Sequence, residues 1–383
     1  MKLLLGFLLI SFLTSLALIS CCDNTSPSDG ENDSEAFKLS LQRDSWILAS
    51  VPSDSIRIGS PPAIEVLAST RAIGCYWRQP PYAASRYDFV PNLSGEDGDI
   101  EVPILRLRVS VNLTEEELAS FPQLAEIESV NTSLGDSVWT GLMQMTSDYP
   151  LDLSDQEYLE VWVNDYQQDQ EHRIGKVHFD LGFIDEDFWR PSFNELDTED
   201  YPDVNGVLDE DEDTGLDGIF DPLEHPDNWG PYGSSQDPAG DNFDDNMQVP
   251  EIGDSYYKIN GMEGNGRLDT EDLDGNGYLT QHNYYYSLSL DLSETPFTDM
   301  VEVFTSAIGV PPQDNKAWRL YRISLSGAII RGEPVGDLGW DQINSVRFWI
   351  DGFNASSHDP EQPFNRLEIA SLKFAGEALP PWR

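Results

Sequence analysis

Short runs in which apolar and polar residues alternate recur along two stretches of the chain, residues 37–195 and 284–383. In the run Ile104–Val111, leucine and valine alternate with arginine and serine, which places one face of a strand in a core and the other in solvent. Pro, Gly and Asn separate such runs. Further strands are predicted at Trp139–Met145, Tyr158–Val163, Lys176–Leu181, Tyr284–Leu292, Trp318–Ser324, Ser345–Ile350 and Leu367–Phe374.

Helical patterning is weak and is confined to Glu115–Ser120 and Thr298–Ser306. The many short strands therefore predict an all-β fold, an antiparallel β-sandwich. Tyr158–Val163 and Ser345–Ile350 resemble each other in sequence, and we expect these two strands to lie side by side in one sheet. Residues 196–283 carry too few apolar residues for a core of their own, so we predict an acidic insertion that interrupts a single sandwich.

One phrase occurs three times in this insertion: an acidic residue, any residue, Asn, Gly, any residue and Leu. The copies are Asp203–Leu208, Glu263–Leu268 and Asp274–Leu279. Ca²⁺ takes about six to eight oxygen ligands, which a short segment supplies by alternating carboxylates and amides around a glycine at a sharp turn. The phrase is typical of an EF-hand calcium loop. Each copy is partial: Tyr201 and Gly261 stand where the first two copies would need an opening acid, and Asn283 stands where the third would need a closing Glu.

A fourth loop begins at Asp213, and Pro202, Pro222 and Pro226 exclude regular helices around the first loops. We interpret these segments as calcium-ordered turns rather than paired EF-hands. The alternative is a solvated acidic loop, because Asp-Gly and Asn-Gly are ordinary turn formers. The candidate Ca²⁺ ligands are Asp203, Asn205, Asp209 and Glu212; Asp213, Asp217, Asp221 and Glu224; Glu263, Asn265 and Asp269; and Asp272, Asp274 and Asn276.

The formal net charge is -47 on 383 residues. Such a chain is repelled by nucleic acid and by anionic membrane surfaces, so neither is an expected partner. Divalent cations are the natural counter-charge. The apolar content is still sufficient for a packed core, which argues against global disorder.

The first residues form a secretory signal with a basic start and an apolar run from Leu3 to Ile19. The run leads into Leu18-Ile19-Ser20-Cys21, which resembles a bacterial lipobox, so residues 1–20 are expected to be a lipoprotein signal peptide and Cys21 the lipid anchor. An ordinary cleaved signal or an uncleaved membrane helix is the alternative. Residues 21–36 have the composition of a flexible tether. Whether Cys22 pairs with Cys75 stays open.

Several phrases, in this order, resemble the repeated sandwich modules of the SprA/Sov cell-surface proteins of Bacteroidota. They are Trp139–Met143, Glu157–Val163, His178–Asp187, Asn205–Asp209, Glu212–Gly218, Asp237–Phe243, Arg319–Ile323 and Val346–Ile350. That family forms the outer-membrane translocon of type IX secretion and serves gliding motility. The resemblance implies a galactose-binding-like jelly roll at the cell surface. This chain has no room for the family's membrane barrel, so we expect one extracellular module on a lipid anchor, without translocation.

We therefore expect a non-enzymatic envelope binding or assembly module of the outer membrane, with Ca²⁺ as its cofactor, an envelope protein or a glycan as its partner, and contact with the membrane only through the lipid. No metalloprotease, nucleophile-elbow or phosphate-loop motif occurs. The alternative is a carbohydrate-binding module or glycoside hydrolase with structural calcium, because a hydrolase needs only two suitably spaced carboxylates. Trp229 and Tyr232 are the candidate ligand-binding residues. A third interpretation of the chain is an acidic structural spacer without metal.

Overall fold

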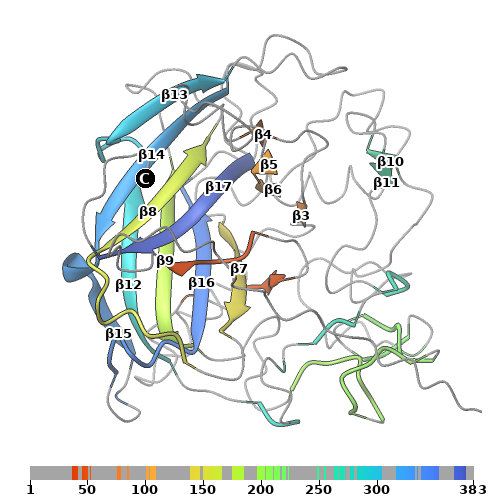
Figure 1. Ribbon diagram of the computed structural model, residues 1–383. Helices are drawn as coiled ribbons and strands as arrows, with labels where there is room; N and C mark the ends of the chain where they lie inside the picture. The colour runs from red at the N-terminus through yellow and green to blue at the C-terminus, as the bar shows by residue number, and fades with distance from the viewer. Residues whose placement is uncertain are drawn as a thin grey trace, which may run out of the picture. The chain divides into compact units, whose positions relative to one another are not determined.

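The computed structural model describes residues 37–41, 45–50, 52, 76–78, 84–85, 101–102, 104–108, 139–146, 150–165, 175–184, 196–202, 204–209, 211–215, 218–220, 223, 248–249, 254–255, 263–266, 268–270, 272, 277–279, 283–303, 316–332, 334, 338–352 and 366–376. Most of their strands form two antiparallel sheets that pack together around an apolar core (Figure 1). The predicted all-β antiparallel sandwich is confirmed.

The first sheet, called the β8 sheet, has its strands in the order β13 (Asp299–Val303), β14 (Lys316–Ser324), β8 (Tyr158–Asn164), β17 (Arg366–Ala375), β6 (Leu105–Arg108) and β3 (Tyr76–Arg78). β1 (Phe37–Lys38) pairs with the end of β17 that β6 leaves uncovered. A bulge between Ile369 and Ser371 shifts the register of β17 against β8. The bulge lets one long strand keep its apolar side chains on the core side along its whole length.

The second sheet, called the β9 sheet, has the order β15 (Ile329–Gly332), β12 (Tyr284–Asp291), β9 (Lys176–Phe183), β16 (Ser345–Asp351), β7 (Trp139–Met145) and β2 (Ile47–Leu48). Two short pairs stand apart, β4 (Ala84–Ser85) with β5 (Glu101–Val102) and β10 (Gln248–Val249) with β11 (Asp254–Ser255). A 3₁₀ turn, η7 (Leu325–Gly327), follows β14. Among the described residues, no helix has the length and apolar character needed to cross a membrane.

Two expectations about individual segments are wrong. The similar strands β8 and β16 belong to opposite sheets, with β8 between β14 and β17 and β16 between β9 and β7. Each strand turns one face to the shared core, so alternation alone does not tell which sheet it joins. The weak helical pattern at Thr298–Ser306 gives the strand β13, since pairing with β14 decides the state of this segment. Glu115–Ser120 lies outside the described residues.

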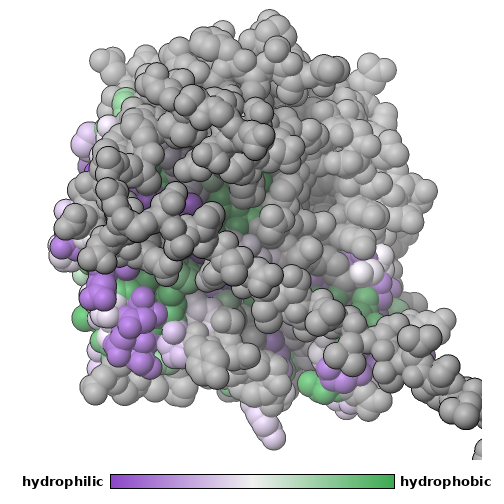
Figure 2. All heavy atoms as spheres, viewed as in Figure 1, coloured by the Kyte–Doolittle hydropathy of each residue, from purple (hydrophilic) through white to green (hydrophobic). Residues whose placement is uncertain are grey.

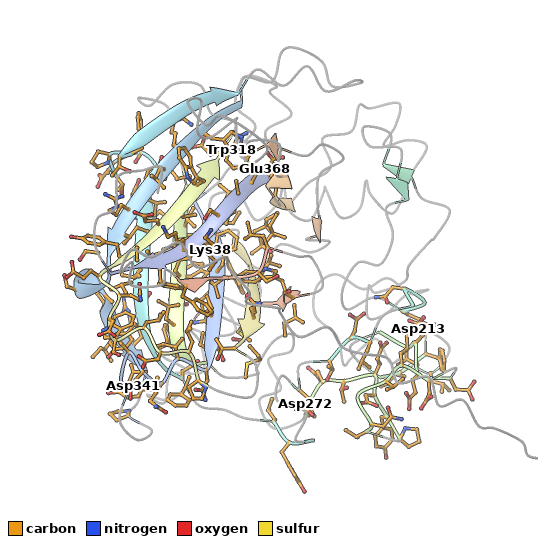
Figure 3. The ribbon with its side chains drawn as sticks, in the orientation of Figure 1. Lys38, Asp213, Asp272, Trp318, Asp341 and Glu368 are labelled. Carbon is orange, nitrogen blue, oxygen red and sulfur yellow. The ribbon has the colours of Figure 1, made fainter. Side chains whose placement is uncertain are left out.

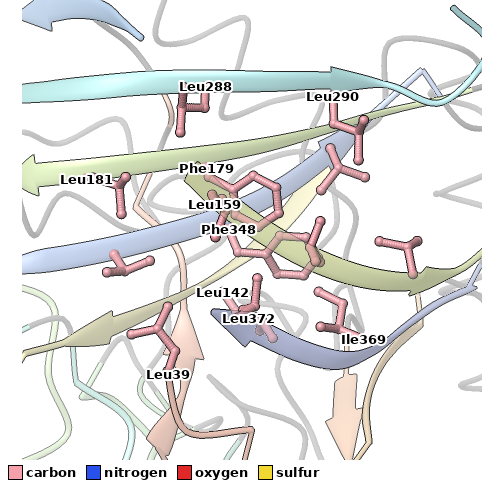
Figure 4. Packing of buried hydrophobic residues seen from close by; sticks show 14 of the residues in the cluster. Leu39, Leu142, Leu159, Phe179, Leu181, Leu288, Leu290, Phe348, Ile369 and Leu372 are labelled. Atoms are coloured by element: carbon pink, nitrogen blue, oxygen red, sulfur yellow. The ribbon is translucent and has the colours of Figure 1, made fainter. Parts of the chain in front are cut away.

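The core lies between the two sheets and is made from side chains of both (Figure 4). The rings of Phe179 on β9 and Phe348 on β16 stack with their centroids 5.6 Å apart. Leu159 and Leu372, from the β8 sheet, belong to the same buried cluster. Burial of such side chains from both sheets is what holds a sandwich together.

The acidic stretch joins two strands that pair directly. β9 and β12 pair along eight positions, from Tyr284 opposite Phe183 to Asp291 opposite Lys176. The chain therefore leaves the β9 sheet after Phe183 and returns to it at Tyr284, beside the point of departure. A long connection between two paired strands is tolerated when it leaves their pairing unchanged, as an inserted loop does.

On its face away from the core, the β9 sheet holds a buried ion pair. Nε and Nη2 of Arg347 lie 2.8 and 2.7 Å from Oδ2 of Asp180, and both residues are buried. Nε1 of Trp349 donates to the same oxygen at 3.0 Å. Nη1 of Arg347 donates to Oγ of Ser50, and its guanidinium stands 4.9 Å from the centroid of the Tyr285 ring. This network fixes neighbouring strands β9 and β16 to the segment after β2.

Candidate functional site

The described part of the acidic insertion is organised by a repeated pentapeptide, Leu-Asp-Thr-Glu-Asp, at residues 196–200 and 268–272. The two copies meet in an antiparallel bridge between Thr198 and Thr270. In each copy the threonine Oγ1 accepts the N–H of the aspartate two residues later, Asp200 or Asp272, at 3.1 Å. The duplication therefore places two aspartates in equivalent local conformations.

Each of three Asn-Gly turns is held by the carboxylate of an aspartate. In turn 1, Asp200 accepts the N–H groups of Asn205 and Gly206 at 3.1 and 2.7 Å. In turn 2, Asp213 accepts those of Asn265 and Gly266 at 3.0 and 2.8 Å. In turn 3, Asp272 accepts the N–H of Gly277 at 2.8 Å. The three glycines have φ of 75°, 66° and 75°, a left-handed conformation that favours glycine.

The structure thus supplies the opening acids that the first two copies of the phrase lack. Asp200, one residue before Tyr201, holds turn 1, and Asp213, which precedes turn 2 by about fifty residues in sequence, takes the place of Gly261. Figure 3 labels Asp213 and Asp272 among the side chains of these loops. Sequence spacing finds the third turn alone, because only there does the holding acid precede its own turn by the regular interval.

Turns 1 and 2 are interlocked through two Glu-Asp pairs, residues 199–200 and 212–213. In each pair the aspartate holds one turn and the glutamate binds the chain that follows the other turn. Oε1 of Glu199 accepts the N–H of Asp269 at 2.6 Å, and Oε2 of Glu212 accepts the N–H of Asp209 at 3.0 Å. The two turns therefore form one unit, in which neither keeps all its hydrogen bonds if the other opens.

The side chains that follow each turn are matched as well. Nδ2 of Asn205 donates to Oδ2 of Asp209 at 3.0 Å, and Nδ2 of Asn265 donates to Oδ2 of Asp269 at 2.5 Å. Asn265 and Asp269 are buried, whereas Asn205 and Asp209 are exposed. The second turn is therefore the inner member of the pair.

Glu199 lies at the centre of this unit. Its side chain is buried, and its Oε2 accepts the N–H groups of Thr214 and Gly215 at 3.2 and 3.1 Å. Burial, together with the negative charges of Asp269 and Asp213, raises the pKa of Glu199 to about 9, although the N–H donors act in the opposite direction. A positive ion at this place would relieve the repulsion between these carboxylates.

The predicted site residues divide into two groups. The structure brings Asn205, Asp209 and Glu212 together around turn 1, and it brings Asp213, Asn265 and Asp269 together around turn 2. Glu263 pairs with Thr214 in a second bridge, and Asp272 holds turn 3. The remaining candidates lie outside the described residues: Asp203, Asp217, Asp221, Glu224, Asp274, Asn276, Cys21, Trp229 and Tyr232.

Glu199 and Asp200 lie outside the three copies of the phrase, although their hydrogen bonds make them part of the unit. The exact repeat of their pentapeptide at residues 268–272 is the sequence signal that points to them. The donor chemistry of the unit, carboxylate and amide oxygens, fits a hard cation such as Ca²⁺. Within the described residues, however, no three Asp, Glu, His or Cys side chains are gathered closely enough to hold a metal ion.

A second polar cluster lies on the β9 sheet, on the face that carries the Arg347 ion pair. Nδ1 of His178 lies 2.8 Å from Oγ of Ser289, and its Nε2 lies 3.2 Å from Oδ1 of Asp351. A nucleophilic hydrolase would also need N–H donors aimed at a developing oxyanion. The backbone of His178 is paired with Ser289 on one side and Trp349 on the other, so cross-strand packing accounts for these contacts.

The tryptophans of this face are packed against other rings. Trp349 stacks on His178 with centroids 3.7 Å apart, and Trp139 meets it edge-on at 6.2 Å. Sugar recognition by stacking needs an uncovered ring face. These contacts use Trp349 for packing within the sheet.

No protein-family model matches the sequence, and no curated protein shows significant similarity to it.

Proposed function

We propose that this protein is a lipid-anchored binding or assembly module of the cell envelope whose acidic loops become ordered around Ca²⁺. The interlocked unit of turns 1 and 2 is the observation that carries the proposal. Its carboxylates lie on a duplicated scaffold, and the buried Glu199 stands beside the negative charges of Asp269 and Asp213, which supports a cation at this place. The charge of the segment agrees: residues 196–283 contain 24 Asp and Glu against two Lys and Arg.

The oxygens of Asn205, Asp209 and Glu212 are the proposed Ca²⁺ ligands of turn 1. Those of Asn265, Asp269 and Glu199 are the proposed ligands beside turn 2. Asp200 and Asp213 orient the two turns through their backbone N–H groups. Binding of the ion would offset the mutual repulsion of these groups, so it would stabilise the folded insertion by mass action.

Placement at the outer membrane and cell surface rests on the lipobox-like sequence before Cys21 and on the resemblance to the SprA/Sov modules. The same resemblance supports a role beside gliding or secretion machinery. The hydrolase alternative gains no support from the His178 cluster, whose polar contacts run between paired strands of one sheet.

A calcium titration of the full-length chain in neutral detergent tests the proposal. Calorimetry is expected to show binding of more than one ion in the micromolar-to-millimolar range. The melting temperature should fall when a chelator is added. The variant Asp213→Asn, which alters the acid that holds turn 2, should weaken binding, whereas Asp341→Asn, an exposed acid of the sandwich, should not. Absence of heat together with an unchanged melt would leave the acidic loops without a metal role.

A further inference from the structure

Exposed apolar side chains are concentrated in the acidic loops. Of the nine large apolar residues that are exposed in the described part of the chain, six belong to this segment: Tyr201, Val204, Val207, Phe220, Leu223 and Tyr278. Figure 2 shows hydrophobic and hydrophilic atoms side by side in the loop region at the lower right. A group of exposed apolar side chains that is rimmed by polar residues is typical of an interaction surface.

Turn 1 presents two valines in fixed positions. Val204 and Val207 flank Asn205–Gly206, and 51% and 59% of their surfaces are exposed. The turn itself is held by Asp200, and the N–H of Val207 donates to Oδ1 of Asn205 at 2.7 Å. The valines are therefore displayed by a preformed turn, which lowers the entropy cost of binding to them.

The turn does not need these valines for its own structure. Turn 2 has the same hydrogen bonds from an aspartate, but Gly264 and Arg267 stand at the positions that correspond to Val204 and Val207. The hydrogen bonds that an aspartate makes to such a turn therefore do not require valines at these two positions.

Turn 3 adds to the same surface. A Cβ atom built on Gly277 would lie 3.9 Å from Cγ1 of Val204, so the two turns are in close contact. Tyr278, the next residue, is 78% exposed. Tyr201, Val204, Val207 and Tyr278 are called the turn 1–3 surface below.

We infer that the turn 1–3 surface binds a cationic polypeptide segment that carries apolar side chains. Charge complementarity selects this partner, because the surrounding segment has 24 acidic and two basic residues. A second copy of a chain with a net charge of -47 and an anionic lipid surface are both repelled. The inference deepens the proposed function, on which it rests, by giving the chemistry of the partner and the surface that binds it.

Binding of two synthetic peptides to the full-length chain tests this inference. One peptide alternates lysine with leucine, and its control alternates lysine with serine at the same length. Fluorescence anisotropy should show that the lysine–leucine peptide binds at least tenfold more tightly. The double variant Val204→Ser/Val207→Ser should reduce this affinity about tenfold, since two exposed methyl-bearing side chains are lost from the contact. The variant Ile330→Ser, at an exposed isoleucine on β15, should leave it unchanged.

Equal binding of both peptides would overturn the inference, because charge alone would then explain the association. An equal loss in the Ile330→Ser variant would also overturn it, because the apolar contact would then not be specific to the turn 1–3 surface. Calcium calorimetry on the same samples separates the two proposals. Calcium binding without selective binding of the lysine–leucine peptide overturns the surface inference and leaves the metal-ordered loops. Selective peptide binding without calcium binding supports the surface and overturns the role of the metal.

Discussion

The sandwich and the acidic insertion bury carboxylates in different ways. In the sandwich, Asp180 and Asp165 are buried against arginines, with Arg347 and Arg319 at 2.7 and 3.0 Å. In the insertion, Glu199 is buried against backbone N–H groups. Full positive charges balance the first set, whereas the N–H groups around Glu199 do not outweigh its burial and the negative charges of Asp269 and Asp213, so its pKa is raised. A bound cation would therefore stabilise the sandwich little, because its buried carboxylates already have positive partners. It would stabilise the insertion more, because Glu199 has none among the described residues.

The largest expected effect comes from removing the acid of a buried ion pair in the sandwich. Asp180→Ala should lower the free energy of unfolding by about 3–5 kcal/mol, because it leaves the Arg347 guanidinium and the Trp349 N–H buried without their shared acceptor. Denaturant unfolding of the purified chain measures this change.

The matched control for Asp180→Ala is Lys176→Met on the same strand. Lys176 pairs with Asp291 at 3.5 Å, and its side chain is 53% exposed. Exposed pairs contribute about 0–1 kcal/mol, so this variant should be nearly neutral. Equal losses for the two variants would show that burial does not set the energy of these pairs.

The stability of the insertion should depend on pH through the buried carboxyl group of Glu199. The pKa of Glu199 is raised to about 9 in the folded state, from a usual value of 4.5, so the folded loops hold one proton more than the opened loops between these values. In the presence of chelator, the free energy of loop opening should therefore fall as pH rises from about 5 to about 9, and then level off. Hydrogen exchange at the Asp269 amide, which donates to Glu199, reports the opening.

Glu199→Gln should remove this pH dependence, since the amide does not ionise in the window. Asp152→Asn serves as control and should leave the pH dependence unchanged. Asp152 lies on an exposed loop of the sandwich, and hydrogen bonds from Ser154 lower its pKa, so it does not titrate in this window. Saturating Ca²⁺ should flatten the wild-type profile by favouring the charged carboxylate. A profile that rises with pH would contradict the burial of a carboxyl group at this position.

The two regions also differ in how far the sequence predicts them. Alternation located β7 and β16 to within one residue, because one face of each strand must be apolar. Which sheet each strand joins depends on tertiary pairing, as the separation of β8 from β16 shows. In the insertion, the Asn-Gly turns could be predicted, and so could Asp272 as the acid of turn 3, but the acids that hold turns 1 and 2 could not be assigned to them. Asp213 reaches turn 2 across a long stretch of chain, and no local spacing contains that contact.

The smallest expected effect tests whether turn 1 is as preformed as its hydrogen bonds indicate. Gly206 has φ of 75°, and a Cβ placed there would meet no atom within 4 Å, so Gly206→Ala introduces backbone strain without a clash. It should destabilise the turn by about 1 kcal/mol. Exchange of the Val207 amide should then quicken about fivefold. Gly327→Ala, which has open space and no left-handed φ, should have no such effect on its own turn. An unchanged Val207 rate would mean that turn 1 is already open in solution, and the contrast with the rigid sandwich would extend to the backbone itself.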